Sequence, residues 1–148
     1  MVPFAYPVFL DLAGVPVLVV GGGTIALRKV GGLVEAGAAV TVVAPQVVPE
    51  LAALPVVIER RAYAAGEAAG YQLVITATDD PQVNAQVAAD ATAARVWVNS
   101  ADDPDNCSFI LPAVARRGLV TVAVSTGGAS PALAGHLRTQ IAREVLTP

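Results

Sequence analysis

The chain has 148 residues, of which 55% are hydrophobic and only 14% charged, a composition that argues against disorder and is sufficient for one substantial core. Its formal net charge of −3 argues against a general nucleic-acid partner, and no apolar run approaches the ~20 residues needed to cross a membrane. Cys107 is the only cysteine, which excludes an intrachain disulfide and favours a cytoplasmic location, and with the single histidine it cannot supply a four-ligand zinc site.

The first predicted element is a buried strand over residues 15–20, an apolar run that ends in three glycines. From Thr24 the apolar residues recur at three- and four-residue steps, which predicts a helix that ends near Gly37. Asp80 and Pro81 have the residue types of a helix N-terminus, and that helix is expected to run to about Ala94. Further buried strands are predicted at residues 39–44, 56–59, 73–76 and 96–99.

Strands that alternate with helices indicate βαβ units, and strands without polar alternation indicate a parallel sheet covered on both faces. The predicted fold class is therefore α/β, with a Rossmann-like doubly wound parallel sheet over residues 1–106. Residues 107–148 are expected to form an appendage that does not fold independently. In it, strands at 109–115 and 119–125 are predicted to form a hairpin through residues 116–118, followed by a loop and a helix from Ser130 to about Val145.

The glycines after the first strand form a dinucleotide-binding fingerprint, Gly21-x-Gly23-x-x-Ala26, with Gly22 between them. The first glycine permits a tight turn, the second lets a pyrophosphate approach the backbone, and the small third residue lets helix and strand pack closely. The motif follows a strand and opens a helix, the context that favours cofactor binding over an ordinary glycine-rich turn. The acid usual after the second strand is replaced by Pro45 and Gln46, without an adjacent arginine for a 2′-phosphate, which favours NAD over NADP.

Taken in order, five pieces of the sequence resemble the precorrin-2 dehydrogenase family, which includes stand-alone enzymes and the N-terminal module of trifunctional sirohaem synthases. The resemblance extends from about Tyr6 to Ala134, and its specificity comes from the order and spacing of the pieces. These are YPVFLDLAGVPVLVVGGGTIALRK, LVEAGAAVTVVAP, LVITATDDPQVN, VNSADDPDNCSFILPAVARRG and VTVAVSTGGASPALA.

The resemblance implies NAD-dependent dehydrogenation of precorrin-2 to sirohydrochlorin, with Fe²⁺ insertion into sirohydrochlorin as a further activity of some members. It also implies a homodimer built partly through the hairpin. Members usually continue into a helical C-terminal segment, whereas this chain stops at Pro148, which leaves a short form, a fragment and a need for another chain as alternatives.

Site residues follow from the resemblance position by position. Thr24, Ile25, Pro45 and Gln46 match the family's NAD contacts. Thr126 takes the place of a serine that trifunctional members phosphorylate, and it is a candidate substrate contact. The family's key carboxylate lies three residues after an Asn and six before a Ser, and both counts select Asp102. A carboxylate there could accept the proton lost on dehydrogenation. The residues alone favour an ordinary turn around Pro104, and the resemblance reverses that preference.

The other candidates have structural alternatives. Thr78 follows the fourth strand and could face the dinucleotide, whereas Asp80 is expected to cap a helix. Arginines could bind substrate carboxylates, with solvated turn and helix surface as the alternative, and these are Arg116, Arg117 and Arg138. Two other functions stay open, a dinucleotide sensor without turnover and a ferrochelatase without redox activity.

Overall fold

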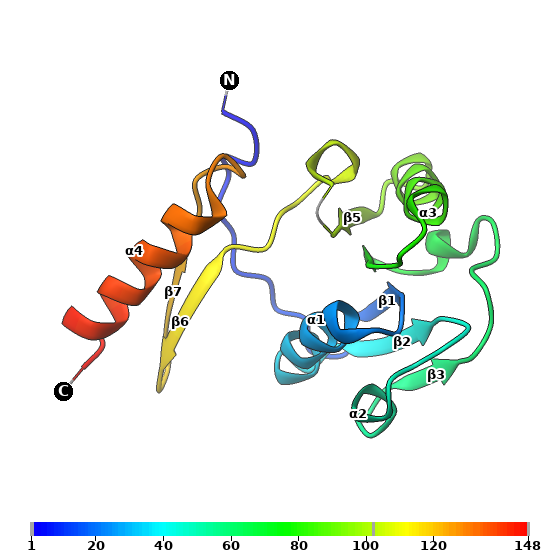
Figure 1. The fold of residues 1–148 in the computed structure, drawn as a ribbon, viewed down its shortest axis with the longest axis horizontal. Helices are drawn as coiled ribbons and strands as arrows, with labels where there is room; N and C mark the ends of the chain where they lie inside the picture. The colour runs from blue at the N-terminus through cyan, green and yellow to red at the C-terminus, as the bar shows by residue number, and fades with distance from the viewer. Residues whose placement is uncertain (1, 102, 148) are drawn as a thin grey trace. The chain divides into compact units, whose positions relative to one another are not determined.

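The computed structural model describes residues 2–101 and 103–147, which divide into two compact units (Figure 1). The first unit is Phe9–Phe109, called here the sheet unit. The second, called the hairpin unit, contains the described residues of 1–8 and 110–148. Within the described residues, no helix is both long and apolar enough to span a bilayer.

The sheet unit is built on five parallel strands in the order β3-β2-β1-β4-β5. The chain moves outward from β1 to β3 and then returns to place β4 on the other side of β1, which confirms the predicted doubly wound sheet. All five strands lie within one residue of their predicted bounds: β1 (Pro16–Val20), β2 (Ala39–Val43), β3 (Val57–Glu59), β4 (Leu73–Thr76) and β5 (Trp97–Ser100).

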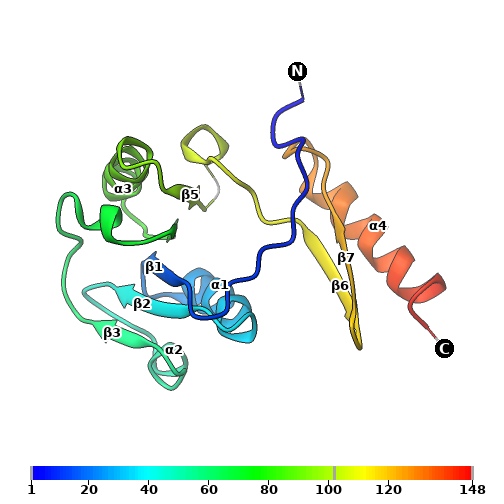
Figure 2. The same cartoon turned by 180° about the vertical axis from the view of Figure 1, so that it is seen from behind.

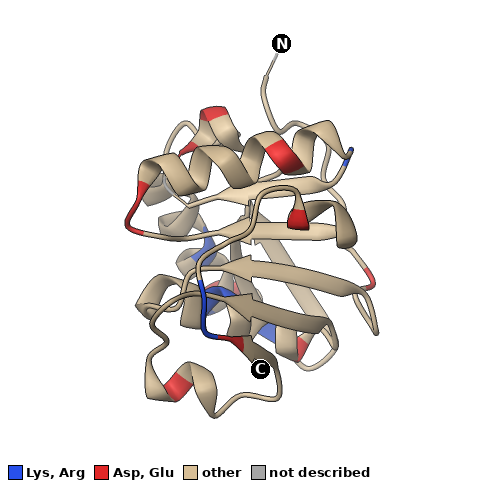
Figure 3. Ribbon diagram, turned by 90° about the vertical axis from the view of Figure 1, so that its right-hand side faces the viewer, with Lys and Arg blue, Asp and Glu red and all other residues tan. Residues whose placement is uncertain are grey.

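Apolar side chains on both faces of the sheet explain why the strands read as continuous runs. Val17 and Val19 pack with α1 (Thr24–Glu35) and the short α2 (Pro49–Ala52), whereas Leu18 and Val20 pack with α3 (Pro81–Ala93). Among the five strands the only charged residue is Glu59 in β3, and the other charged residues that the structure describes in the sheet unit fall on helices and loops (Figure 3). The Asp80 carboxylate accepts a hydrogen bond of 2.9 Å from the Gln82 amide, which confirms the predicted cap.

The hairpin unit contains β6 (Ala113–Arg117), β7 (Val120–Val124) and α4 (Pro131–Glu144), with α4 packed against both strands (Figure 2). The predicted hairpin is present, but its first strand was placed too early and its turn was predicted over residues 116–118. Pro112 has no N–H for a strand ladder, so pairing begins at Ala113. Arg117 pairs with Val120, which leaves a two-residue turn whose first residue, Gly118, has a positive φ of 57°.

Three short helical segments were not predicted: α2 and the two 3₁₀ turns η1 (Glu67–Gly70) and η2 (Pro104–Asn106). Each is four residues or shorter, too short to show helical periodicity. The η2 turn falls in the polar segment after β5, where the residues alone predicted an ordinary turn around Pro104.

Candidate functional site

The candidate site lies at the edge of the sheet where the parallel strands end. Val20, the last residue of β1, is in register with Val43 of β2 and Thr76 of β4, and Thr76 is in register with Ser100 of β5. The glycine loop and the segments after β2, β4 and β5 therefore all start at one edge. Open α/β sheets bind their ligands there, beside the point where the strand order reverses.

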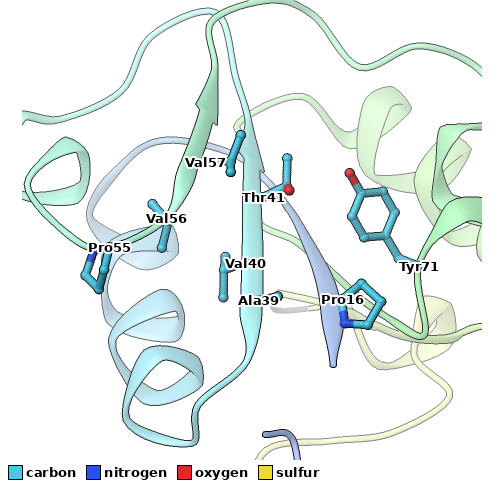
Figure 4. Close-up of a pocket in the computed structure, with 8 residues that line it drawn as sticks. All are labelled: Pro16, Ala39, Val40, Thr41, Pro55, Val56, Val57 and Tyr71. Carbon is cyan, nitrogen blue, oxygen red and sulfur yellow. The ribbon is translucent and has the colours of Figure 1, made fainter. Parts of the chain in front are cut away.

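A separate cavity of about 540 Å³ lies at the opposite end of the strands (Figure 4). Its lining includes Pro16, Ala39 and Val57, which are the first residues of β1, β2 and β3. The lining is mainly apolar, with the hydroxyl-bearing side chains of Thr41 and Tyr71 on one side. Since this cavity is at the amino ends of the strands, it is not part of the site formed by the glycine loop.

Gly21 makes the sharp turn that follows β1. Its φ of +128° belongs to glycine, and a Cβ built on it would lie 2.4 Å from the Ala77 carbonyl oxygen of the neighbouring strand end. Its amide donates to the Val43 carbonyl oxygen at 3.0 Å, and the Ala77 amide donates to Val20 at 2.8 Å. The loop is thus fixed to the ends of both strands that flank β1.

Gly22 is buried against the segment that follows β2. A Cβ on Gly22 would lie 2.1 Å from the Gln46 carbonyl oxygen, and the Gly22 carbonyl oxygen accepts from the Val48 amide at 2.9 Å. The middle residue of the fingerprint must therefore be small because the chain itself packs there. The outer face of this segment, with Pro45 and the Gln46 side chain, is exposed.

Gly23 differs from its two neighbours because no atom lies within 4 Å of a Cβ built on it. It is the N-cap of α1, with φ of −92° and no side-chain cap, and Gly23, Thr24 and Ile25 are all exposed. The first amides of a helix have no partner within the helix, and its N-terminus carries partial positive charge. This open, uncapped helix start fits the pyrophosphate of a dinucleotide.

Thr78, a candidate cofactor contact, uses its hydroxyl within the protein. The hydroxyl donates to Asn84 Oδ1 at 2.8 Å, and the same oxygen accepts from the Thr78 amide at 3.1 Å and from the Thr76 hydroxyl at 2.6 Å. Asn84 Nδ2 in turn donates to the Thr78 carbonyl oxygen at 3.0 Å. Asn84 thereby ties the end of β4 to the first turn of α3.

A second polar cluster closes the end of β5. The Asn99 carboxamide accepts from Lys29 Nζ at 3.4 Å and donates to the Phe109 carbonyl oxygen at 3.1 Å. The Cys107 thiol lies 3.1 Å from the Ser100 amide nitrogen and 3.2 Å from its carbonyl oxygen, and burial raises the pKa of this thiol. These contacts make Cys107 a packing residue of this cluster.

The predicted base, Asp102, lies outside the described residues. In the rest of its segment, Asp103 accepts a hydrogen bond of 2.6 Å from the Asn106 side chain. Among the described residues no three His, Cys, Asp or Glu side chains gather as a metal site would require.

The four candidate substrate-binding residues all belong to the hairpin unit. Arg138, half-buried on α4, donates to the Val114 carbonyl oxygen at 3.3 Å, and Arg117 donates to the Leu146 carbonyl oxygen. Thr126 exchanges hydrogen bonds with the Ser130 backbone, donating at 3.0 Å and accepting at 2.8 Å. Arg116 is an exposed residue of β6.

Sequence reasoning named neither Lys29 nor Asn84 as part of this edge. Their partners lie far along the chain, and Lys29 and Asn99 are 70 positions apart. The sequence signal available for Asn84 was a polar amide early in a predicted helix. For Lys29 it was that the chain has one lysine.

Comparison with known proteins identifies the family. Residues 8–113 match the family described as "Putative NAD(P)-binding", and residues 117–144 match "Sirohaem biosynthesis protein central". A solved structure described as "SirC, precorrin-2 dehydrogenase" superposes with a TM-score of 0.81 at 34% identity, over 93% of this chain and 70% of that one. This chain belongs to the precorrin-2 dehydrogenase family. Membership confirms the resemblance drawn from the five sequence pieces, and the expectation of NAD as cofactor is likewise confirmed.

Curated relatives of the family are longer. Siroheme synthases of Methylococcus capsulatus and Pseudomonas putida are each 50% identical to the chain over 91% of its length. The aligned part is 29% of the first relative and 30% of the second, so the chain spans about three tenths of their length.

Proposed function

We propose that the chain oxidises precorrin-2 to sirohydrochlorin with NAD⁺, as a member of the precorrin-2 dehydrogenase family. The observation that carries this proposal is the glycine loop. Two of its glycines are required by contacts within the protein, whereas the third leaves an open, uncapped helix N-terminus at the edge where the other strand ends meet. Its support from comparison is the match to a precorrin-2 dehydrogenase at 34% identity.

In this mechanism the start of α1 would hold the dinucleotide pyrophosphate, and the exposed Pro45 and Gln46 would hold the adenosine ribose. NAD⁺, when bound, supplies the acceptor for the hydride that leaves the macrocycle. A proton leaves the macrocycle in the same oxidation, and Asp102 accepts it as general base. Precorrin-2 thus loses a hydride, which carries two electrons and one proton, and it also loses a second proton to the carboxylate. The products are sirohydrochlorin, NADH and H⁺.

The substrate's carboxylates are assigned to the hairpin unit. Guanidinium groups pair carboxylates with two parallel hydrogen bonds, and Arg116 and Arg117 of β6 and Arg138 of α4 are the arginines proposed to do so. Arg117 and Arg138 each contact one carbonyl oxygen, which leaves other N–H groups of their guanidinium groups to donate. Thr126 supports the loop before α4 through Ser130, and its role toward substrate is to position that loop.

The decisive experiment mixes the purified chain with precorrin-2 and NAD⁺ without oxygen and follows NADH together with the visible spectrum of the macrocycle. We expect NADH and sirohydrochlorin to form together in the wild type. Asp102→Asn removes the base at nearly constant size and should lower kcat by about 10²-fold or more. Asp105→Asn, an exposed carboxylate of the same segment, is the matched control and should retain activity.

Binding of NAD⁺ without any turnover by the wild type would refute the dehydrogenase and favour the dinucleotide sensor. Loss of activity in Asp105→Asn equal to that in Asp102→Asn would refute the assignment of the base. Fe²⁺ insertion into sirohydrochlorin is proposed as a second activity with Fe²⁺ as substrate, supported by the siroheme synthase relatives. It should persist in Gly23→Ala, since metal insertion needs no dinucleotide.

A homodimer in the cytoplasm is the proposed assembly, with the hairpin in its interface. Leu119 and Val120 at the turn of the hairpin are exposed, and so are Leu133 and Leu137 of α4. Apolar side chains grouped on one small unit suit an interface between two copies. Light scattering should give twice the chain mass, and Leu119→Asp with Val120→Asp should yield monomers. A wild type that is monomeric at micromolar concentration would refute the dimer.

A further inference from the structure

Lys29 connects α1 to the end of β5, two elements that carry different parts of the proposed site. Its Nζ lies 3.4 Å from Asn99 Oδ1, a long hydrogen bond in which the lysine charge adds to the attraction. Asn99 is only 6% exposed, and its Nδ2 holds the Phe109 carbonyl oxygen at 3.1 Å. The buried Asn99 carboxamide thus links Lys29 to the Phe109 backbone. Asn99 itself belongs to β5, so this side chain connects the two ends of the segment between β5 and Phe109.

That segment leaves the sheet at Ser100 and returns at Ser108. The Ser108 amide donates to the Val98 carbonyl oxygen at 2.8 Å, and the Ser108 hydroxyl accepts from the Val98 amide at 2.7 Å. The Cys107 thiol contacts the backbone of Ser100 at the other side of the same base. Both ends of the segment are therefore fixed to β5, one through Val98 and the other through Ser100. Asn99 is the β5 residue between these two.

The positive charge of Lys29 is opposite in sign to the carboxylates of this segment. Three aspartates fall in the sequence between Asn99 and Phe109, and the chain has no other lysine. Burial raises the pKa of the Cys107 thiol, the Asp103 charge adds to this rise, and the Lys29 charge opposes it. Lys29 also sits in the second turn of the helix whose first turn would hold the dinucleotide.

We infer that Lys29 is a positioning residue: by holding Asn99 it fixes the segment that contains the proposed base relative to the helix that binds the cofactor. This inference rests on the proposed dehydrogenase and names a residue that determines its geometry. Displacing a catalytic group by about 1 Å costs on the order of 10²-fold in rate. Loss of the Lys29 contact should therefore lower kcat and leave dinucleotide affinity unchanged, because the start of α1 is untouched.

The test compares Lys29→Met and Lys29→Arg with Arg28→Met, which removes an exposed cation from the adjacent position of the same helix. Anaerobic turnover gives kcat and KM for precorrin-2, and fluorescence titration gives the Kd for NAD⁺. We expect Lys29→Met to lower kcat about ten- to a hundredfold with an NAD⁺ Kd within about twofold of wild type. Lys29→Arg should recover most of kcat, and Arg28→Met should match wild type.

Amide hydrogen exchange supplies a readout that does not need turnover. Exchange should accelerate at residues 99–109 in Lys29→Met, return toward wild type in Lys29→Arg, and stay unchanged in Arg28→Met. If Lys29→Met does not fold, Lys29→Gln, which is uncharged but polar, takes its place. An active wild type, with kcat and exchange unaltered in the neutral variant that folds, would overturn this inference alone. A wild type without turnover would remove the proposed function and this inference together.

Discussion

The three glycines after β1 should respond very differently to the same substitution, and Gly21→Ala against Gly23→Ala is the sharpest test of the site. An alanine at position 21 would have to adopt φ near +128° and place its Cβ 2.4 Å from the Ala77 carbonyl oxygen. An alanine at position 23 keeps φ near −92° and meets no atom within 4 Å.

The magnitudes follow from these two environments. A non-glycine residue forced to positive φ costs about 1–3 kcal/mol, and relief of the overlap with a backbone oxygen costs about as much again. The sum for Gly21→Ala is about 2–6 kcal/mol, and at about 2–4 °C per kcal/mol a central value of ~4 kcal/mol lowers Tm by about 8–16 °C. Gly23→Ala changes only a helix N-cap from glycine to alanine, which costs at most about 1 kcal/mol.

Dinucleotide affinity should show the opposite order of effects. The Cβ of Gly23→Ala projects into the open space where the pyrophosphate approaches, so NAD⁺ should bind at least about tenfold more weakly, a loss of about 1.4 kcal/mol. Thermal unfolding by circular dichroism and titration with NAD⁺ measure the two quantities on the same preparations. Equal Tm values for Gly21→Ala and wild type, or undiminished NAD⁺ affinity in a well-folded Gly23→Ala, would refute this account of the loop.

Three further substitutions test the polar groups around the sheet. Asn84→Ala leaves the Thr76 and Thr78 groups without their partner and should lower the free energy of unfolding by about 2–3 kcal/mol in urea, while exposed Gln82→Ala should not. Ser100→Ala removes a buried hydroxyl that has no hydrogen-bond partner among the described residues, so urea unfolding should show stability unchanged or raised, and a loss above about 1 kcal/mol would contradict this. Hydrogen bonds from the Gly66 amide and the Tyr63 hydroxyl lower the pKa of the Asp90 carboxyl in the folded protein. The ionised carboxylate therefore stabilises the fold above the ordinary pKa of a carboxyl group, and this stabilisation is lost as pH falls through the lowered pKa. The difference in urea midpoint between wild type and Asp90→Asn should persist at pH 7 and close as pH falls through that lowered pKa.

The parallel sheet could be predicted from sequence because burial on both faces leaves an unbroken apolar signal. Residues 39–43 and 73–76 show it most clearly, and only strand ends differed from prediction. The hairpin was harder. Phe109 was predicted to start a strand because it is aromatic and followed by apolar residues, yet it packs against the hydrophobic core of the sheet unit.

The candidate site was predictable only where a local pattern encodes it. Gly21, Gly23 and Ala26 form such a pattern, and the fully buried Ala26 shows the close packing it implies. The need for a glycine at position 22 comes from the Gln46 carbonyl oxygen, which belongs to another loop. The contact between Lys29 and Asn99 likewise joins a helix to a strand that is formed much later in the chain. Contacts of this kind follow from tertiary packing, and no periodicity in one sequence contains them.

The hydrogen bonds at this edge suggest how little the site must rearrange to bind its cofactor. The segment after β2 is held by Val48 to Gly22, the segment after β4 by Asn84, and the segment after β5 by Asn99 and Cys107. Each is fixed by groups of the protein itself, so ligand binding does not have to supply their ordering entropy. The groups left exposed are those at the start of α1, whose amides a pyrophosphate would satisfy. Order in the supporting loops and exposure at one helix start are what a preformed dinucleotide site requires.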